Sequence, residues 1–204
     1  MVVADPSHPR RAGVERYIEA RFDKAFGARV LSHYPTLTGL CGPEGSVLAA
    51  AGVRFAETEP LFLERYLDGP VERVIAEAFE RPVARDSVVE IGSFASDTPA
   101  ASLQLFHALA AWLGSSCGRR FAVATARPDL QRLLGRAGFD LRSLVDADPA
   151  CLGEGARDWG TYYDRSPRVF AAEIGASAVL PQLRRRLRAR SMARAVRRMP
   201  SVTL

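Results

Sequence analysis

Apolar residues along the chain follow two different spacings, and these spacings alternate in blocks. Apolar positions three or four residues apart indicate amphipathic helices, whereas short apolar or alternating runs indicate strands. The helical spacing predicts helices at residues 13–26, 71–79, 99–112 and 130–137. The strand-like runs predict strands at residues 30–34, 36–41, 46–57, 87–95, 121–125, 139–145 and 168–174. Helices separate most of the later strands, which is the order typical of an α/β fold.

The turns and connections in this order predict a mixed sheet. A Gly-Pro-Glu-Gly turn at residues 42–45 joins strands 36–41 and 46–57, so these strands should form a hairpin. Strand 121–125 is apolar almost throughout, as expected for a strand buried on both faces. Crossover helices between consecutive strands favour parallel pairing. We therefore predict an α/β (α+β) fold whose mixed central sheet has a parallel centre and is flanked by helices.

The end of the chain differs in composition from the rest. Residues 176–204 contain eight arginines and no acidic residue, whereas residues 1–175 hold 20 basic and 23 acidic residues, a net charge of −3. The overall net charge of +5 therefore belongs to this tail. Apolar residues recur among the arginines over residues 181–199, which predicts a basic helix. We expect one domain at residues 1–175 and a separate arginine-rich helix or tail at 176–204.

The chemistry of this basic helix leaves its partner open. It fits a packed or solvated terminal helix, a dock for an acidic carrier protein, or a helix lying on an anionic membrane surface through residues 180–199. Nucleic acid is the least favoured partner, because no aromatic side chains interleave with the arginines. We predict that no nucleic acid is bound.

Two further features indicate where the chain works. The three cysteines (Cys41, Cys117 and Cys151) are far apart and odd in number, which favours reduced thiols and a cytoplasmic location. The first residues lack the basic and apolar runs of a secretory signal.

Residues 98–118 carry no charge, but their proline, polar and glycine positions leave only about 14 residues of helix, fewer than a membrane span needs. We expect a buried helix there.

Several common catalytic and binding motifs do not occur in the sequence. Neither a Gly-x-Ser-x-Gly elbow nor a glycine-rich nucleotide loop follows a predicted strand. The three histidines do not cluster with cysteine or acidic residues at the spacing of metal ligands. We therefore predict no metal and no tightly bound cofactor.

Glu90 is the most informative single residue, because it lies in an otherwise apolar strand. A buried charge is costly unless it is paired or used. One interpretation is a structural ion pair with an arginine on a neighbouring strand, such as Arg54. The other is a general base whose pKa is raised by burial.

Gly92 lies two residues further along the same strand. A glycine inside a strand indicates a bulge or a close approach of another chain segment. A bulge here would separate this strand from its neighbour and free backbone N–H groups at residues 94–97, which could polarise a carbonyl oxygen. A helix expected to begin at residues 98–99 would add an N-terminus that favours anions.

Five stretches of sequence share their residues with one known family. They are Phe26-Gly27-Ala28, residues 52–56 (Gly-Val-Arg-Phe-Ala), residues 61–68 (Leu-Phe-Leu-Glu-Arg-Tyr-Leu-Asp), residues 89–96 (Val-Glu-Ile-Gly-Ser-Phe-Ala-Ser) and residues 159–163 (Trp-Gly-Thr-Tyr-Tyr). In these stretches, over about residues 14–175, the chain resembles the thermostable hemolysin family. That family is similar in layout to acyl-homoserine-lactone synthases and to the GNAT acyltransferase fold.

The resemblance implies an N-acyltransferase that moves an acyl group from an acyl-carrier protein or acyl-CoA thioester to an amino-acid-like amine. Glu90 would be the base and Tyr163 a proton donor. The thioester would lie at Gly92, Ser93, Phe94, Ala95 and Ser96. The acceptor would lie among Arg54, Glu64 and Trp159. Ordinary structural roles stay open for these residues: Glu64 as a solvated helix residue, and Trp159 and Tyr163 as core or lid aromatics.

The sequence differs from the usual GNAT pattern at one point, and one alternative function stays open. Residues 97–102 (Asp-Thr-Pro-Ala-Ala-Ser) lack the basic residue and the glycines with which GNAT enzymes usually bind coenzyme A, and this favours the phosphopantetheine arm of an acyl-carrier protein as the donor. The alternative function is a membrane-active, hemolysin-like protein that works through its cationic helix.

Overall fold

Seven strands form one sheet in the computed structural model, which describes residues 1–175. The strands are β1 (Val2–Ala4), β2 (Thr36–Cys41), β3 (Val47–Phe55), β4 (Val88–Ser96), β5 (Phe121–Ala126), β6 (Leu141–Asp146) and β7 (Arg168–Glu173). They lie in the order β1-β2-β3-β4-β5-β7-β6. Only β4 and β5 pair in parallel, and they lie at the centre of the sheet. The predicted mixed sheet with a parallel centre is confirmed.

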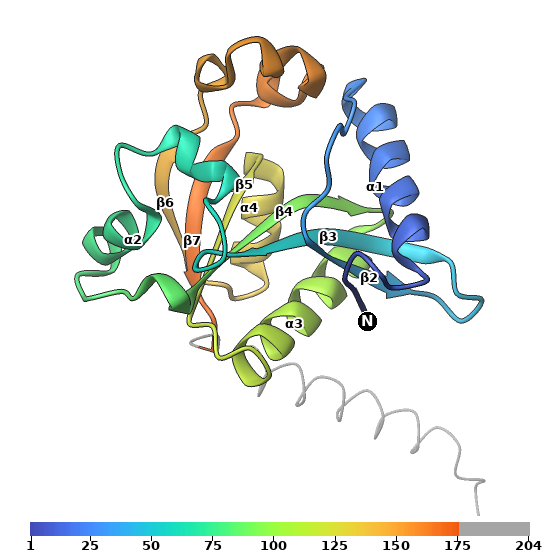
Figure 1. The fold of residues 1–204 in the computed structure, drawn as a ribbon, viewed down its shortest axis with the longest axis horizontal. Coiled ribbons are helices and arrows are strands. Elements are labelled where there is room, and N and C mark those ends of the chain that lie inside the picture. Colours follow the sequence, from blue (N-terminus) through green and yellow to red (C-terminus); the bar gives the residue numbers. More distant parts are fainter. Residues whose placement is uncertain (176–204) are drawn as a thin grey trace, which may run out of the picture.

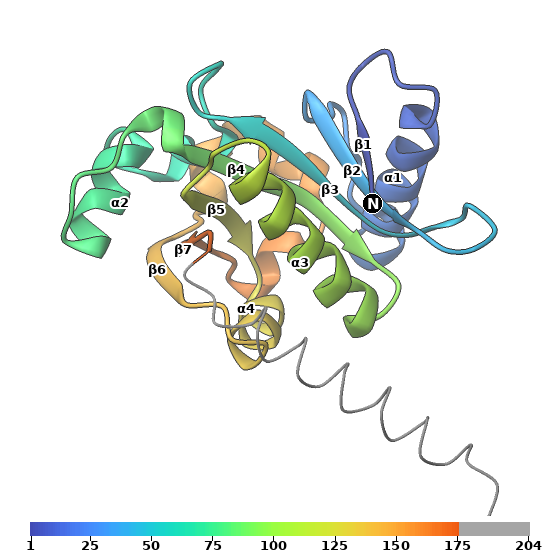
Figure 2. The same cartoon turned by 90° about the horizontal axis from the view of Figure 1, so that it is seen from below.

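Helices cover both faces of the sheet (Figure 1). On one face lie α1 (Arg11–Phe26), α2 (Val71–Phe79) and the short 3₁₀ helices η1 (Phe62–Tyr66), η3 (Pro149–Trp159) and η4 (Tyr162–Arg165). The other face is covered by α3 (Pro99–Ser115) and α4 (Pro128–Arg136), as Figure 2 shows. A further 3₁₀ turn, η2 (Arg85–Ser87), leads into β4.

The uncharged segment at residues 98–118 forms the predicted buried helix. Thr98 caps α3 by accepting the N–H of Ala101 at 3.1 Å, and Pro99 takes the first helical position, where no N–H is needed. Leu105, Leu109 and Leu113 are fully buried against the sheet. Among residues 1–175, no helix combines the length and the apolar character that crossing a membrane requires.

The structure corrects one predicted strand, adds one that was not predicted, and leaves two predictions untested. Residues 30–34 form no strand; where this segment ends, the carbonyl oxygens of Tyr34 and Pro35 accept hydrogen bonds from the Arg11 guanidinium, each at 2.9 Å. The edge strand β1 was not predicted, since three residues are too few for a periodic pattern. The basic helix at 181–199 lies outside the described residues, and the domain boundary at residue 175 stays a prediction.

The connection between β3 and β4 is fastened by Glu64. Its carboxylate accepts the backbone N–H groups of Leu61 (2.9 Å) and Val71 (3.1 Å) and pairs with Arg85 at 2.7 Å. Burial raises the pKa of Glu64, but these hydrogen bonds outweigh burial, so the pKa lies below the ordinary value. Glu64 therefore fixes both ends of the loop that holds η1 over the sheet.

Replacing Glu64 with alanine should lower the free energy of unfolding by about 2–3 kcal/mol, because two backbone N–H groups and Arg85 lose their acceptor. Urea denaturation at pH 7 measures this loss. Glu77→Ala is the matched control, because its side chain is 72% exposed and lies 3.9 Å from Arg73; it should change the free energy by less than about 0.5 kcal/mol.

The Glu64 contribution should also depend on pH in one direction. A carboxyl group with a lowered pKa in the folded state stabilises above its unfolded pKa of about 4.3, and this stabilisation disappears as pH falls through the folded value. The difference between wild type and Glu64→Ala should therefore shrink in acid. A difference that stays constant down to acid pH would contradict the ionic role.

Candidate active site

The two central parallel strands separate halfway along their length. β4 pairs with β5 only at Val88–Phe121, Val89–Ala122 and Glu90–Val123. Beyond Glu90 both strands continue, β4 to Ser96 and β5 to Ala126, without further pairing to each other. The separation expected from the sequence is therefore present, and Glu90 lies at its vertex.

A bulge in β4 accompanies the separation. Across the β3–β4 pair, Gly52 faces Gly92 and Ala50 faces Ala95, so β4 has one residue more than β3 in this interval. Ser93 takes up the difference with a φ of 46°, which is rare for a residue with a side chain. The bulge was expected at Gly92 and lies one residue later.

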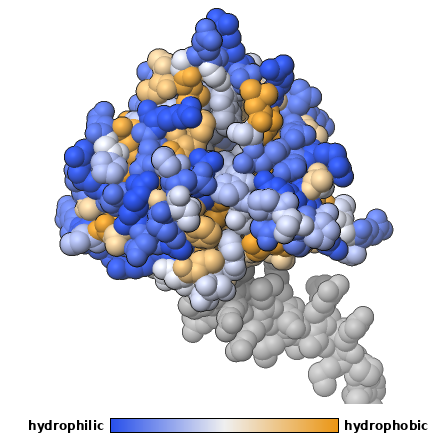
Figure 3. Space-filling model, in the orientation of Figure 1, coloured by the Kyte–Doolittle hydropathy of each residue, from blue (hydrophilic) through white to orange (hydrophobic). Residues whose placement is uncertain are grey.

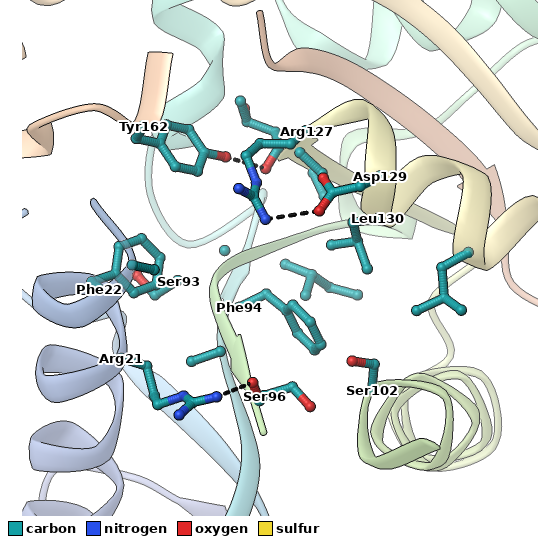
Figure 4. Close-up of a pocket in the computed structure, with 18 of the residues that line it drawn as sticks. Arg21, Phe22, Ser93, Phe94, Ser96, Ser102, Arg127, Asp129, Leu130 and Tyr162 are labelled. Atoms are coloured by element: carbon teal, nitrogen blue, oxygen red, sulfur yellow. Dashed lines mark hydrogen bonds and ion pairs between the residues drawn. The ribbon is translucent and has the colours of Figure 1, made fainter. Parts of the chain in front are cut away.

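The gap between the strands opens into a cavity of about 760 Å³ (Figure 4). Its residues come from β4 (90–96), β5 (124–126) and helices on both faces of the sheet, including α1, α3 and α4. The cavity therefore reaches both faces of the sheet at the place where the strands have separated. All five predicted donor-site residues lie along its β4 edge: Gly92, Ser93, Phe94, Ala95 and Ser96.

Glu90 is only 2% exposed and is held by backbone amides. Its Oε2 accepts the N–H of Phe62 at 2.9 Å and its Oε1 accepts the N–H of Leu63 at 3.0 Å. Arg54 faces Glu90 across the β3–β4 pair, but its Nε lies 3.4 Å from the carboxylate of Glu59. The interpretation of Glu90 as the direct ion-pair partner of Arg54 is therefore wrong.

Burial raises the pKa of Glu90 above the ordinary value for a glutamate. The Phe62 amide, the positive charge of Arg54, the Leu63 amide and the Tyr34 hydroxyl act in the opposite direction without cancelling the rise. A carboxylate with a raised pKa accepts a proton more readily near neutral pH. The geometry at Glu90 thus suits a base.

Tyr34 is a component of the site that the sequence analysis missed. Its ring lies over the facing glycines of β3 and β4: a Cβ at Gly52 would be 2.4 Å from the Tyr34 Cγ, and one at Gly92 would be 2.0 Å from the Tyr34 hydroxyl oxygen. On the ring, the Arg54 guanidinium lies 4.9 Å from the centroid. Gly52 and Gly92 each interrupt a predicted strand, but only the structure shows that they face each other.

Backbone donors along the β4 edge are fewer than expected. The N–H of Asp97 donates to the carbonyl of Leu48 at 3.1 Å, so it is not free. Because successive peptide groups of a strand point to opposite sides, the amide of Ser96 points away from β3, toward the gap. The Ser96 carbonyl accepts a hydrogen bond from Arg21 at 2.7 Å.

Aromatic side chains form the wall of the cavity on the α1 face. This wall consists of Phe22, Phe26, Phe62, Tyr66, Trp159, Tyr162 and Tyr163. The hydroxyl oxygens of Tyr66 and Tyr163 lie 2.5 Å apart. Burial raises the pKa of Tyr163, so this phenol stays protonated at neutral pH and can donate a proton. On the face of the molecule seen in Figure 3, apolar residues form several separate patches among hydrophilic ones.

The structure does not bring all predicted acceptor residues together. Trp159 lies in the aromatic wall, whereas neither Arg54 nor Glu64 lines the cavity. Arg54 is engaged by Glu59 and Glu64 by Arg85. The acceptor-binding role of these two residues stays a prediction that their geometry does not favour.

The cations of the cavity come from other elements. Arg21 and Lys24 of α1, Arg127 before α4, and Arg132 and Arg136 of α4 line its rim. Arg127 pairs with Asp129 at 2.8 Å and points into the opening beside Tyr162, as Figure 4 shows. Within residues 1–175, no three His, Cys, Asp or Glu side chains lie close enough together to hold a metal ion.

Comparison with known families identifies the family of the chain. A sequence-family model, Thermostable hemolysin, matches residues 4–178. The chain belongs to the thermostable hemolysin family. A search of the curated proteins by sequence found no match.

Solved structures show which known folds this family member resembles. The acyl-homoserine-lactone synthase LasI matches with a TM-score of 0.59 and 13% identity, over 86% of this chain and 91% of LasI. FeeM, an N-acyl amino acid synthase from uncultured soil microbes, matches with a TM-score of 0.59 and 14% identity, over 89% and 96% of the two chains.

A third structure of the same fold contains ligands. BjaI, a CoA-dependent acyl-homoserine lactone synthase with SAM and isopentyl-CoA, matches with a TM-score of 0.59 and 14% identity, over 90% of this chain and 87% of BjaI. Two N-acetyltransferase structures match as well. At these identities the likeness shows the fold, and the GNAT-like architecture predicted for this chain is confirmed.

Gly92→Ala should destabilise the protein by about 1–3 kcal/mol, because its methyl group would overlap the Tyr34 hydroxyl. In a Tyr34→Ala background the same substitution should cost less, since the overlapping atoms are gone. Gly13→Ala is the control: no atom lies within 4 Å of a Cβ there, and alanine should stabilise α1 by about 0.5–1 kcal/mol. Equal losses from Gly92→Ala in both backgrounds, measured by urea denaturation, would show that Tyr34 does not occupy this position.

Proposed function

We propose that this protein is an N-acyltransferase that moves an acyl group from a thioester to an amine. One observation carries the proposal: β4 and β5 separate beyond Glu90 and leave a cavity that reaches both faces of the sheet. A thioester from one face and an amine from the other can meet in such a gap. The fold shared with acyl-homoserine-lactone synthases and an N-acyl amino acid synthase supports the same reaction class.

The residues at the gap suit the steps of this reaction. The acyl carbonyl lies along the free edge of β4 at residues 92–96, where the Ser96 N–H, which points toward the gap, polarises its oxygen. The amine attacks the carbonyl carbon, and Glu90 receives the proton that the nitrogen loses. The N–C bond forms, the C–S bond breaks, and the departing sulfur takes a proton from Tyr163 or from water.

The donor side favours an acyl-carrier protein over free acyl-CoA. Pro99 has no N–H and the N–H of Ala101 is occupied by Thr98, so the start of α3 offers few donors to a pyrophosphate. The exposed side chains of Arg132 and Arg136 lie at the rim, where they suit the single phosphate of a phosphopantetheine arm and an acidic carrier surface. The free cysteines favour a reducing compartment such as the cytoplasm.

The acceptor side suits an amine with an apolar body. The aromatic wall that contains Trp159 offers stacking area, and Glu90 lies at its inner end. Arg127 points into the same opening and can attract a carboxylate. An amino-acid-like amine has an apolar side chain for the aromatic wall, an amine for Glu90 and a carboxylate for Arg127.

Glu90→Gln should strongly slow formation of the product. Circular dichroism should first establish that the variant folds, because glutamine offers only one acceptor oxygen to the two backbone amides that Glu90 binds. Cells that express wild type should accumulate a new N-acylated amine, detected by mass spectrometry of extracts, and the variant should form it about 10²–10⁴-fold more slowly. Glu77→Gln, an exposed position on α2, serves as the expression-matched control and should behave like wild type. If the Glu90 variant forms the same product at the same rate as wild type, Glu90 is not the base. If wild type forms no such product, the protein is not the proposed acyltransferase.

Reversing the charges at the cavity rim should weaken the binding of an acyl-carrier protein more than the binding of acyl-CoA. The double variant Arg132→Glu and Arg136→Glu should bind an acyl-carrier protein at least about tenfold more weakly at low salt, since both exposed cations become repulsive. Titration calorimetry with octanoyl-carrier protein and octanoyl-CoA measures the effect. An unchanged affinity for the carrier protein would rule out docking at this rim.

A further inference from the structure

Glu90 is poorly placed to touch an amine by itself. Both carboxylate oxygens already accept backbone N–H groups, and only 2% of the residue is exposed. β4 loses its pairing with β5 directly after Glu90, so Glu90 lies at the closed end of the gap and Gly92 lies on the unpaired portion of the strand. A base in this position needs another group to connect it with a molecule in the cavity.

Tyr34 supplies such a group. Its hydroxyl oxygen lies over Gly92, so close that a Cβ there would be 2.0 Å away, which places it between the level of Glu90 and the open cavity. Tyr34 also lines the cavity. Its ring is held on one side by the glycine pair and contacted by Arg54. The hydroxyl position is therefore fixed by the fold.

We propose that Tyr34 is a catalytic residue of this site and that its hydroxyl relays the proton of the acceptor amine to Glu90. The inference rests on the proposed acyl transfer. As the amine nitrogen bonds to the thioester carbon, its proton passes to the Tyr34 oxygen while the phenol proton passes to the Glu90 carboxylate. Glu90 later releases that proton to water, the C–S bond breaks, and the thiolate takes up a proton, so the net products are an amide and a thiol.

The electrostatics of the pair agree with a relay. Burial raises the pKa of Tyr34 well above its usual value, and the negative charge of Glu90 adds to the rise. Arg54 lowers the pKa of both groups, and Tyr162 slightly raises that of Tyr34. Tyr34 therefore stays protonated at neutral pH, so it can donate its proton only as it receives another.

The first test needs no substrate. In protein labelled with ¹³C at glutamate carboxyl groups, NMR titration of Tyr34→Phe should show a higher Glu90 pKa than in wild type, because the hydroxyl that favours the charged carboxylate is gone. The phenylalanine ring keeps the packing on the glycine pair. Tyr17→Phe is the matched control, because its hydroxyl donates to the Leu48 carbonyl and Tyr17 does not line the cavity; the Glu90 pKa should not move. An unchanged Glu90 pKa in Tyr34→Phe overturns the inference.

The second test measures turnover with the donor and amine identified from cell extracts. Tyr34→Phe should lower kcat about 10–100-fold, leave the donor KM unchanged, and move the acidic limb of the pH–rate profile upward. Full activity in Tyr34→Phe overturns the relay while the acyltransferase stands. If wild type forms no acylated amine from any donor, the proposed function and the relay fail together.

Discussion

The hydrogen bonds from the Phe62 and Leu63 amides to Glu90 connect the main elements of this structure. They tie η1 on one face to the vertex at which β4 leaves β5. They also allow a carboxylate to stay in the core, because a buried charge needs hydrogen-bond donors. Glu64 fastens the ends of the same loop to Arg85. These two carboxylates thus determine where the aromatic wall lies over the gap.

The glycine pair of β3 and β4 imposes a second constraint. A side chain at either Gly52 or Gly92 would exclude the ring of Tyr34 from the sheet surface. The bulge at Ser93 follows at once and turns the edge of β4 toward the gap. Packing and chemistry therefore depend on the same few positions, and the Tyr34 hydroxyl can lie over Gly92 because the strands carry no side chains beneath the ring.

Local patterns in the sequence predicted most of the helices and strands, since each has a clear apolar period. Glu90 and Gly92 were identified because a charge and a glycine interrupt an apolar strand, and each disturbs packing or pairing. The partners of Glu90 were not predictable, because backbone amides of residues 62 and 63 have no signature in the sequence. Tyr34 lies in a segment without regular structure, and only the three-dimensional pairing of Gly52 with Gly92 reveals its place.

The central claim is that the gap between β4 and β5 receives an acyl thioester. A crystal structure with an acyl-pantetheine analogue, in which a methylene replaces the thioester sulfur, tests it most directly. The account predicts the analogue in the gap, with its carbonyl oxygen along residues 92–96 of β4 and its carbonyl carbon facing Tyr34. Strands paired along their whole length, or an analogue bound elsewhere on the protein, would contradict it.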